Sequence, residues 1–389
     1  MLKNVLPEKR DRMIVFPAIG SQLIVTTSLF LMPLLIETLK AKAGLSGKVA
    51  GLLLSMELAV SALTTLCLSA WVRKHSARHW ALAGGLLTVM ATVLTLISPA
   101  LPVLFVTRLL AGIGAGVVAA EATSVLSRGV DRERLIAIVT IVSITNAAFW
   151  LVVLPYIIDR LGYRGPYACL LLICMIGTFL LRRLPSFSAR HDSGQASHSP
   201  LAISAVLVVL AVFLTQLGQG AFWSMEGAYG IRAGFNSYGI GAVLSASTLL
   251  LLVGAVGAAW TSNRFGRFTS LIVLVAVNAV SIVLVSLIAI HWIYVAANVL
   301  QSITNLSSVI FQLGLAASLD RSGRVVAVST SLVTLGNGLG PSLSANLSGA
   351  FGAPLVGVVV LVLNCVALAF YCAVRLRGVK ETQMSISPA

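Results

Sequence analysis

The feature that most constrains this chain is a series of twelve apolar segments, each close to the length of a membrane-spanning helix. A hydrocarbon core about 30 Å thick needs roughly 20 apolar residues to be crossed by a helix. Because 58% of the 389 residues are hydrophobic and 10% are charged, little sequence is left for soluble domains. We therefore expect an all-α integral membrane protein with twelve transmembrane helices. The predicted spans are 13–36, 48–70, 79–98, 101–125, 134–157, 165–183, 201–224, 237–260, 268–289, 291–318, 323–346 and 352–374.

The positive charges predict the orientation of these spans. With the N-terminus placed in the cytoplasm, most of the 27 lysines and arginines fall in cytoplasmic segments. Cytoplasmic loops are enriched in such residues, so we expect both termini inside and a multi-pass protein of the inner (plasma) membrane. Because the cations lie in short loops between spans, the net charge of +15 does not indicate nucleic-acid binding.

A long polar segment divides the spans into six and six. It covers residues 184–200 and is the only long polar stretch between spans. We expect an N-terminal six-helix half over 1–183, a cytoplasmic linker over 184–200 and a C-terminal six-helix half over 201–389.

An internal repeat supports two pseudo-symmetric halves. Residues 70–78 read AWVRKHSAR after the second span, and residues 259–267 read AWTSNRFGR after the eighth. Equal spacing aligns Trp71 with Trp260 and Arg78 with Arg267, at equivalent places in the two halves.

The fourth span carries an arginine within its apolar run. Arg108, Gly112 and Gly116 are four residues apart, which places them on one helical face. An arginine in hydrocarbon usually faces a bundle interior or a water-filled cavity, although it can also snorkel to the membrane surface. Glycines at this spacing allow a second helix to approach closely. Gly340 and Pro341 in the eleventh span indicate close packing and a kink there.

Two of these motifs resemble signatures of the major facilitator superfamily. The fourth span matches its Arg-x-x-x-Gly-x-x-x-Gly pattern, and GAAWTSNRFGR is similar to its loop signature Gly-x-x-x-Asp-Arg-x-Gly-Arg, with Asn263 in place of the acid. The resemblance implies that helices one, four, seven and ten line a central cavity, and that the loop arginines close its cytoplasmic side. The residues that this assigns to the cytoplasmic gate are Arg78, Asn263, Arg264, Gly266 and Arg267.

Polar side chains form stripes along several spans. The clearest stripe is in the tenth span, where Asn298, Gln301, Asn305, Ser308 and Gln312 are three or four residues apart. Such groups line a polar cavity or join helices by hydrogen bonds, and both interpretations remain open. The candidate substrate-cavity residues are Gln22, Thr26, Arg108, Asn146, Trp150, Gln216, Gln219, Trp223, Asn298, Gln301, Asn305, Thr334 and Asn337.

Four carboxylates lie in the spans, and two of them are candidates for proton coupling. Glu57 lies near mid-membrane and is a candidate proton carrier or a structural hydrogen-bonding group. Glu121 is a second proton-coupling candidate or an interface carboxylate, and it does not share the helical face of Arg108. We expect the counter-charge of Arg108 to be a substrate or a group on another helix, such as Glu57. Glu37 and Glu226 lie at the outer ends of their spans and are expected to be solvated.

These features predict a secondary transporter and not an enzyme. The amide-rich and aromatic stripes suit a small organic solute, moved by alternating access and coupled to protons. Export of amphipathic compounds is favoured slightly over uptake of a small organic acid. A non-transporting receptor of the same fold and a membrane enzyme are the alternatives from other classes. No metal-ligand cluster or phosphate-binding loop is visible, so we expect no cofactor and no metal, and a monomer whose partners are lipid, solute and protons.

Overall fold

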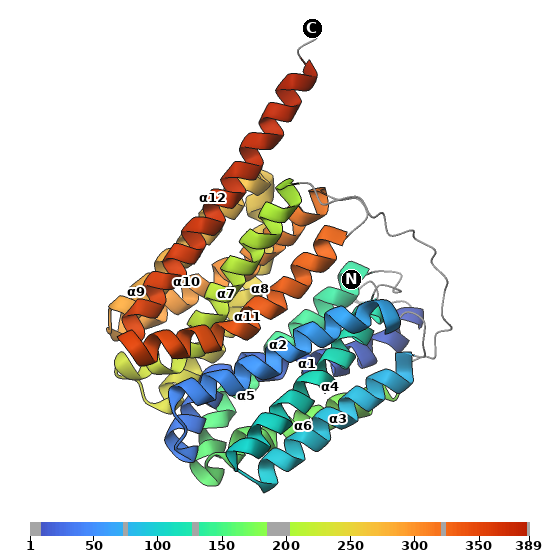
Figure 1. Ribbon diagram of the computed structural model, residues 1–389, viewed down its shortest axis with the longest axis vertical. Coiled ribbons are helices and arrows are strands. Elements are labelled where there is room, and N and C mark those ends of the chain that lie inside the picture. The colour runs from blue at the N-terminus through green and yellow to red at the C-terminus, as the bar shows by residue number, and fades with distance from the viewer. Residues whose placement is uncertain (1–8, 73–76, 127–131, 185–202, 320–323, 387–389) are drawn as a thin grey trace, which may run out of the picture. The chain divides into compact units, whose positions relative to one another are not determined.

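In the computed structural model the described parts of the chain form a series of α-helices (Figure 1). It describes residues 9–72, 77–126, 132–184, 203–319 and 324–386, and no β-strand occurs in these ranges. The helices are Lys9–Ala43 (α1), Gly47–Val72 (α2), Ala77–Ile97 (α3), Leu101–Leu126 (α4), Arg132–Leu161 (α5), Arg164–Leu181 (α6), Ile203–Arg232 (α7), Ser237–Phe265 (α8), Arg267–Leu287 (α9), His291–Leu319 (α10), Arg324–Phe351 (α11) and Ala353–Ile386 (α12).

The helical architecture confirms the prediction of an all-α membrane protein. Within the described ranges, 11 helices are long and apolar enough to cross a membrane. The twelfth, α11, has the length of a span, but its hydroxyl and amide side chains make it less apolar. A helix is favoured in lipid because it satisfies its own backbone hydrogen bonds where no water can do so.

The chain divides into two compact units. The first holds α1–α6 together with residues 237–248 at the start of α8, and the second holds α7, the rest of α8 and α9–α12. The predicted linker over 184–200 lies outside the described residues except for Leu184, which packs in the apolar core of the first unit.

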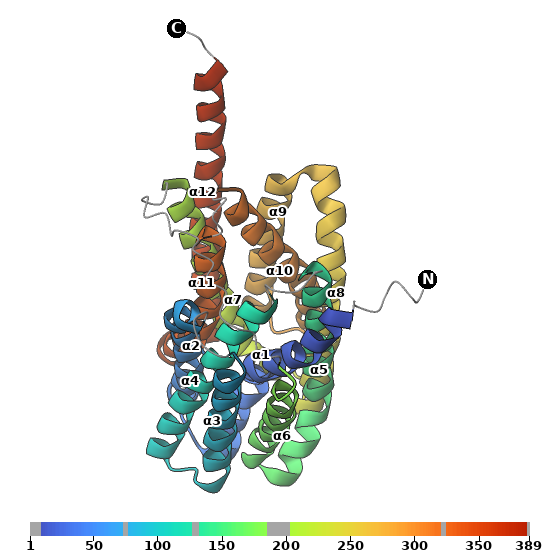
Figure 2. The same cartoon turned by 90° about the vertical axis from the view of Figure 1, so that its right-hand side faces the viewer.

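In the first unit, α4 is the central packing element. It contacts α2 and α3, while α1 packs on α5 and α6, and α3 also contacts α6 (Figure 2). The start of α8 joins this unit along α5, where Ser245 Oγ donates a hydrogen bond to the Ala148 carbonyl oxygen at 2.8 Å.

In the second unit, α7 is the central packing element. It contacts α11 and α12 extensively and α10 and α9 less, and α9 packs on α10 and α12. Pro341 lies inside α11, on the stretch that contacts α7. A Cβ added at Gly340 would lie 2.2 Å from the Ala221 backbone nitrogen, so only a glycine permits this approach.

Candidate functional site

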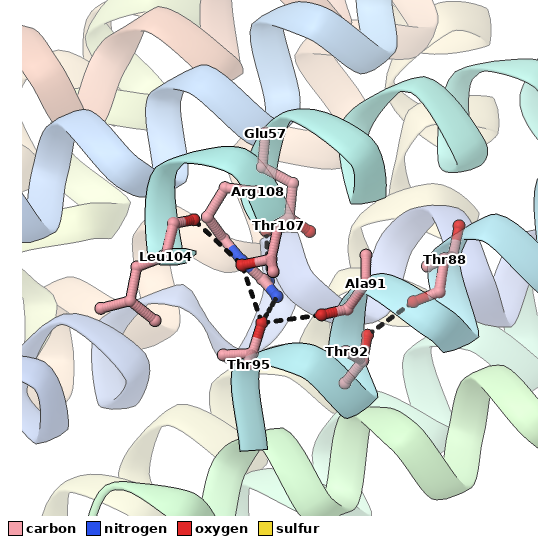
Figure 3. A network of polar contacts seen from close by, with 8 residues as sticks. All are labelled: Glu57, Thr88, Ala91, Thr92, Thr95, Leu104, Thr107 and Arg108. Carbon is pink, nitrogen blue, oxygen red and sulfur yellow. Dashed lines mark hydrogen bonds and ion pairs between the residues drawn. The ribbon is translucent and has the colours of Figure 1, made fainter. Parts of the chain in front are cut away.

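The first polar cluster is centred on Arg108 of α4 (Figure 3). Its side chain is only 2% exposed. Arg108 Nη1 lies 2.8 Å from Glu57 Oε2 on α2, and Nη2 donates a hydrogen bond to Thr95 Oγ1 on α3 at 2.8 Å. The counter-charge of Arg108 in this conformation is therefore Glu57, a group on another helix.

Threonines of α3 extend this cluster. Thr95 Oγ1 lies 2.9 Å from Thr107 Oγ1 on α4 and also 2.9 Å from the Ala91 carbonyl oxygen (Figure 3). Thr88, Thr92 and Thr95 are four and three residues apart and are all buried. None of these threonines is among the candidates predicted from the sequence, although this spacing marks one helical face and was the available signal.

An aromatic ring of α6 completes the enclosure of Arg108. The Arg108 Cζ atom lies 5.0 Å from the centroid of the Tyr167 ring, within the range of a cation–π interaction. Arg108 Nε makes no hydrogen bond to any described residue. Glu57, Thr95 and Tyr167 thus surround the guanidinium from three helices, and of these residues only Glu57 is a candidate predicted from the sequence.

Glycines of α4 allow these helices to come close enough for the ion pair. A Cβ added at Gly112 would lie 2.5 Å from the Glu57 backbone oxygen, and one at Gly116 would lie 2.6 Å from the Ser61 oxygen. On the neighbouring face, a Cβ at Gly114 would lie 2.6 Å from the Gly84 oxygen of α3. Separation of α2 from α4 would therefore also separate Glu57 from Arg108.

We expect Gly112→Ala to lower the free energy of unfolding by about 1–3 kcal/mol, because the added methyl group meets the backbone of α2. Gly314→Ala in α10 is the matched control, since a Cβ there meets no atom within 4 Å. That change should be neutral or stabilise by about 0.5–1 kcal/mol through helix propensity. Unfolding of the purified variants in mixed micelles measures both effects, and equal stabilities would refute the close contact.

Glu121, the second proton-coupling candidate, is also on α4. Its side chain is fully buried, with 0% exposure, thirteen positions beyond Arg108. The structure thus places both candidate carboxyls, Glu57 and Glu121, in the interior of the first unit.

The remaining candidates of the first unit lie on α1 and α5. Gln22, Thr26, Asn146 and Trp150 are all half-buried. Asn146 Nδ2 donates to Thr27 Oγ1 at 3.4 Å, and Trp150 Nε1 donates to Asn146 Oδ1 at 3.1 Å. The Asn146 amide and the Thr27 hydroxyl thus link α5 to α1, and the Trp150 indole holds that amide from within α5. None of these groups carries a formal charge.

In the second unit, three amides form a chain across three helices. Gln216 Nε2 of α7 donates to Gln312 Oε1 of α10 at 3.3 Å, and Asn337 Nδ2 of α11 donates to Gln216 Oε1 at 2.9 Å. Gln216 is 3% exposed and Gln312 is 0% exposed. In this conformation these side chains join helices, which was the alternative to a cavity-lining role.

We expect Gln216→Leu to cost about 1–3 kcal/mol of stability, because it leaves buried partners on α10 and α11 without their hydrogen bonds. The matched control is Gln22→Leu, since Gln22 is half-buried at a comparable place on α1. The control should alter stability little. Thermal unfolding of both variants tests this, and similar losses for the two would contradict a specific role of the amide chain.

The other candidates of the second unit differ in exposure. Gln219, Asn298 and Gln301 are buried, with exposures of 7%, 0% and 2%. The half-buried ones are Trp223, Asn305 and Thr334.

The predicted gate residues lie at helix ends. Gly266 precedes α9 with a φ of 77°, a conformation that favours glycine. Arg78, Arg264 and Arg267 are exposed. The side chain of Asn263 lies outside the described part of the chain.

The expected solvation of Glu226 is wrong. Its side chain on α7 is 0% exposed and accepts a hydrogen bond from Asn298 of α10. Glu37 on α1 is half-buried and forms an ion pair with Lys40 at 2.9 Å. Position along a helix predicts depth in the membrane, but neighbouring helices decide whether water reaches the side chain.

Membrane-length helices that enclose polar networks in each of two compact units are typical of a polytopic transport protein. The sequence matches the family description Major Facilitator Superfamily over residues 18–314. The chain belongs to that superfamily, as its two motifs predicted, and is therefore a secondary transporter and not an enzyme.

Solved structures with this fold agree with the assignment. A bacterial homologue of the human lysosomal transporter Spinster, in an inward-facing and unoccupied conformation, has a TM-score of 0.72 at 14% identity, with 95% of this chain and 97% of that chain covered. The human organic anion transporter MFSD10 has a TM-score of 0.68 at 14% identity, with coverage of 94% and 100%. The nucleoside transporter NupG has a TM-score of 0.70 at 12% identity, with coverage of 94% and 99%. No curated protein matches the sequence.

Proposed function

We propose that this protein is a proton-coupled transporter that exports small amphipathic organic solutes across the inner (plasma) membrane by alternating access. The observation that carries the proposal is the difference in chemistry between its half-buried and its enclosed polar groups. The half-buried candidates are amides, hydroxyls and indoles without formal charge, whereas Arg108 and Glu57 are enclosed and paired. The half-buried set is Gln22, Thr26, Asn146, Trp150, Trp223, Asn305, Thr334 and Asn337.

Uncharged amides and aromatic rings suit solutes with an apolar body and a few hydrogen-bonding groups. An aromatic side chain provides apolar area, while an amide or hydroxyl fixes the orientation of a ligand. A strongly ionic solute would instead require a charged partner in the half-buried set.

The proposed direction follows from the chemistry of such solutes. An amphipathic molecule partitions into lipid and crosses it down its own gradient, so energy coupling is needed only to move it outward. We propose proton entry as the driving reaction, with Glu57 and Glu121 as the candidate coupling carboxyls, in a monomer with both termini cytoplasmic. The exposed loop residues around Arg78 and Arg267 are proposed to close the cytoplasmic side.

A second candidate, proton-coupled uptake of a small organic acid, is favoured by the Arg108–Glu57 pair. If Glu57 takes up a proton, the guanidinium of Arg108 loses its anion in a buried site. A carboxylate on a solute would replace that anion, so proton and organic acid would bind together. The structurally similar MFSD10 is described as an organic anion transporter.

Purified protein in lipid vesicles with an imposed pH gradient separates the two candidates. Ethidium represents an amphipathic solute, and radiolabelled gluconate represents a hydrophilic organic acid. Export by proton antiport predicts ethidium accumulation in vesicles with an acidic interior, and collapse of the gradient by a protonophore should release it. Organic-acid symport predicts gluconate accumulation in vesicles with an alkaline interior.

Protein-free vesicles at the same lipid composition provide the control. Accumulation of gluconate and not of ethidium would replace the first candidate with the second. Two results would contradict proton-coupled transport of these solute classes. One is chemical conversion of either probe, and the other is an amount of probe inside the vesicles that changes neither with the pH gradient nor with the presence of the protein.

A further inference from the structure

Glu226 lies in a buried polar cluster at the end of α7, separate from the Arg108 cluster of the first unit. Asn298 Nδ2 of α10 donates to Glu226 Oε2 at 3.0 Å and to the Tyr294 carbonyl oxygen at 3.0 Å. Tyr294 Oη in turn donates to the Glu226 backbone oxygen at 3.2 Å. Both side chains of the pair Glu226–Asn298 are 0% exposed.

This cluster has more acceptors than donors. Glu226 Oε1 and Asn298 Oδ1 are buried and make no hydrogen bond to any described residue. The amide of Asn298 already donates to two oxygens. A buried acceptor without a donor is costly, so the cluster lacks at least one hydrogen-bond donor or cation.

No cation among the described residues supplies this charge. On α7 itself, the ionisable neighbours are Tyr229, whose hydroxyl donates to the Ala353 carbonyl oxygen, and Arg232, whose Nη1 donates to the Ser286 oxygen of α9 at 3.0 Å. On α10 they are Tyr294 and His291, and the ring of His291 packs against Phe235 at 4.8 Å.

The other helices packed on α7 contribute no ionisable side chain at this end. Tyr229 contacts Ala353 at the start of α12, so this end of α7 adjoins the α11–α12 connection. In the described part of α11 the ionisable residue is Arg324 at the opposite end, and the first ionisable residue of α12 is Cys365, twelve positions beyond Ala353. Glu226 is in neither of the ion pairs Lys40–Glu37 and Arg108–Glu57.

Glu37 in the first half of the sequence is the counterpart of Glu226 in the second half. The spacing that aligns Arg78 with Arg267 also aligns Glu37 with Glu226 and Lys40 with Tyr229. Glu37 has its lysine, 2.9 Å away, and is half-buried. In the second half a tyrosine stands in place of the lysine, and the carboxyl group is enclosed.

We propose that Glu226 binds a proton and that Asn298 is the residue that positions its carboxyl group. An ionised carboxylate enclosed without a cation is strongly unfavourable, and a proton removes the charge. A proton on Oε1 also supplies the donor that the surrounding acceptors lack. The role of this proton in transport rests on the proposed function, whereas its binding does not.

Infrared spectroscopy of the purified protein tests the proposal without a solute. The carbonyl stretch of a protonated carboxylic acid is separate from that of a carboxylate. The wild type should show an acid band at neutral pH that disappears in alkaline buffer. Glu226→Gln should lose this band, and the matched variant Glu37→Gln should retain it. Because no transport is measured, failure of the vesicle experiment would leave this result intact.

Two further measurements complete the test. Asn298→Ala should shift the frequency of the Glu226 band by removing its hydrogen bond, and this variant decides the matter if Glu226→Gln does not fold. The spectra are recorded in potassium and in sodium buffers at one pH. Any of three results would overturn the proposal. These are the absence of an acid band that depends on Glu226, an unshifted band in Asn298→Ala, and loss of the band when sodium replaces potassium.

Discussion

Arg108→Met is expected to lower the free energy of unfolding by about 3–5 kcal/mol, since it leaves the carboxylate of Glu57 in a buried site without its cation. The two side chains are 2% and 9% exposed, so water cannot compensate for the lost partner. Methionine approximately fills the volume of the arginine stem, which limits the contribution of a cavity. Unfolding in mixed micelles measures the change.

A double-mutant cycle shows whether the loss comes from the ion pair. The combined variant Arg108→Met and Glu57→Gln contains no buried charge at this place, so it should recover most of the stability. The matched control is Lys40→Met, which removes the cation of a pair of similar length, 2.9 Å against 2.8 Å. Because Lys40 and Glu37 are partly exposed, at 38% and 20%, that change should cost less than about 1 kcal/mol.

The double variant also shows whether the ion pair has a role in transport in addition to its role in stability. A recovered double variant that still fails to move solute in vesicles would show that the pair acts in the transport cycle itself. Similar losses in Arg108→Met and Lys40→Met, or additive effects in the cycle, would contradict a stabilising buried pair.

The sequence predicted the helical fold because membrane spans leave strong local signals. Each span is an apolar run of limited length, and the loop arginines mark the ends. The signature around Arg108 and Gly112 predicted the superfamily because it combines a charged residue with the small residues that permit close packing. The spacing also implied that the counter-charge of Arg108 is a substrate or a group on another helix, and Glu57 was named among the possibilities.

The remaining parts of the cluster depend on which helices become neighbours. Thr95 contacts Arg108 because α3 packs beside α4, and Tyr167 reaches Arg108 from α6, which packs on α1 and α3. No local pattern in the two spans predicts these neighbours. The burial of Glu226 also depends on neighbouring helices and could not be predicted from its own span. Its place near a span end predicted solvation, whereas its side chain is buried in the second unit and accepts a hydrogen bond from Asn298.

Glu57→Gln is expected to abolish pH-driven accumulation of the transported probe while leaving exchange of the probe across the membrane in place. Glutamine retains an oxygen that accepts the hydrogen bond of Arg108, but it can neither take up nor release a proton. Solute exchange requires only that the loaded protein changes between its two orientations, whereas net accumulation requires the coupled proton. The variant should therefore transport at a rate that no longer depends on pH.

Glu37→Gln is the control for this measurement, because Glu37 lies in the same unit and its pair with Lys40 is partly exposed. It should retain both pH-driven accumulation and the pH dependence of the wild type. Both variants are compared in vesicles that contain equal amounts of folded protein, since the unpaired guanidinium in Glu57→Gln also lowers stability. An unchanged pH profile in Glu57→Gln would remove Glu57 from the coupling reaction and leave the ion pair with a structural role. In that case Glu121 and Glu226 would remain as the buried carboxyls able to carry the proton.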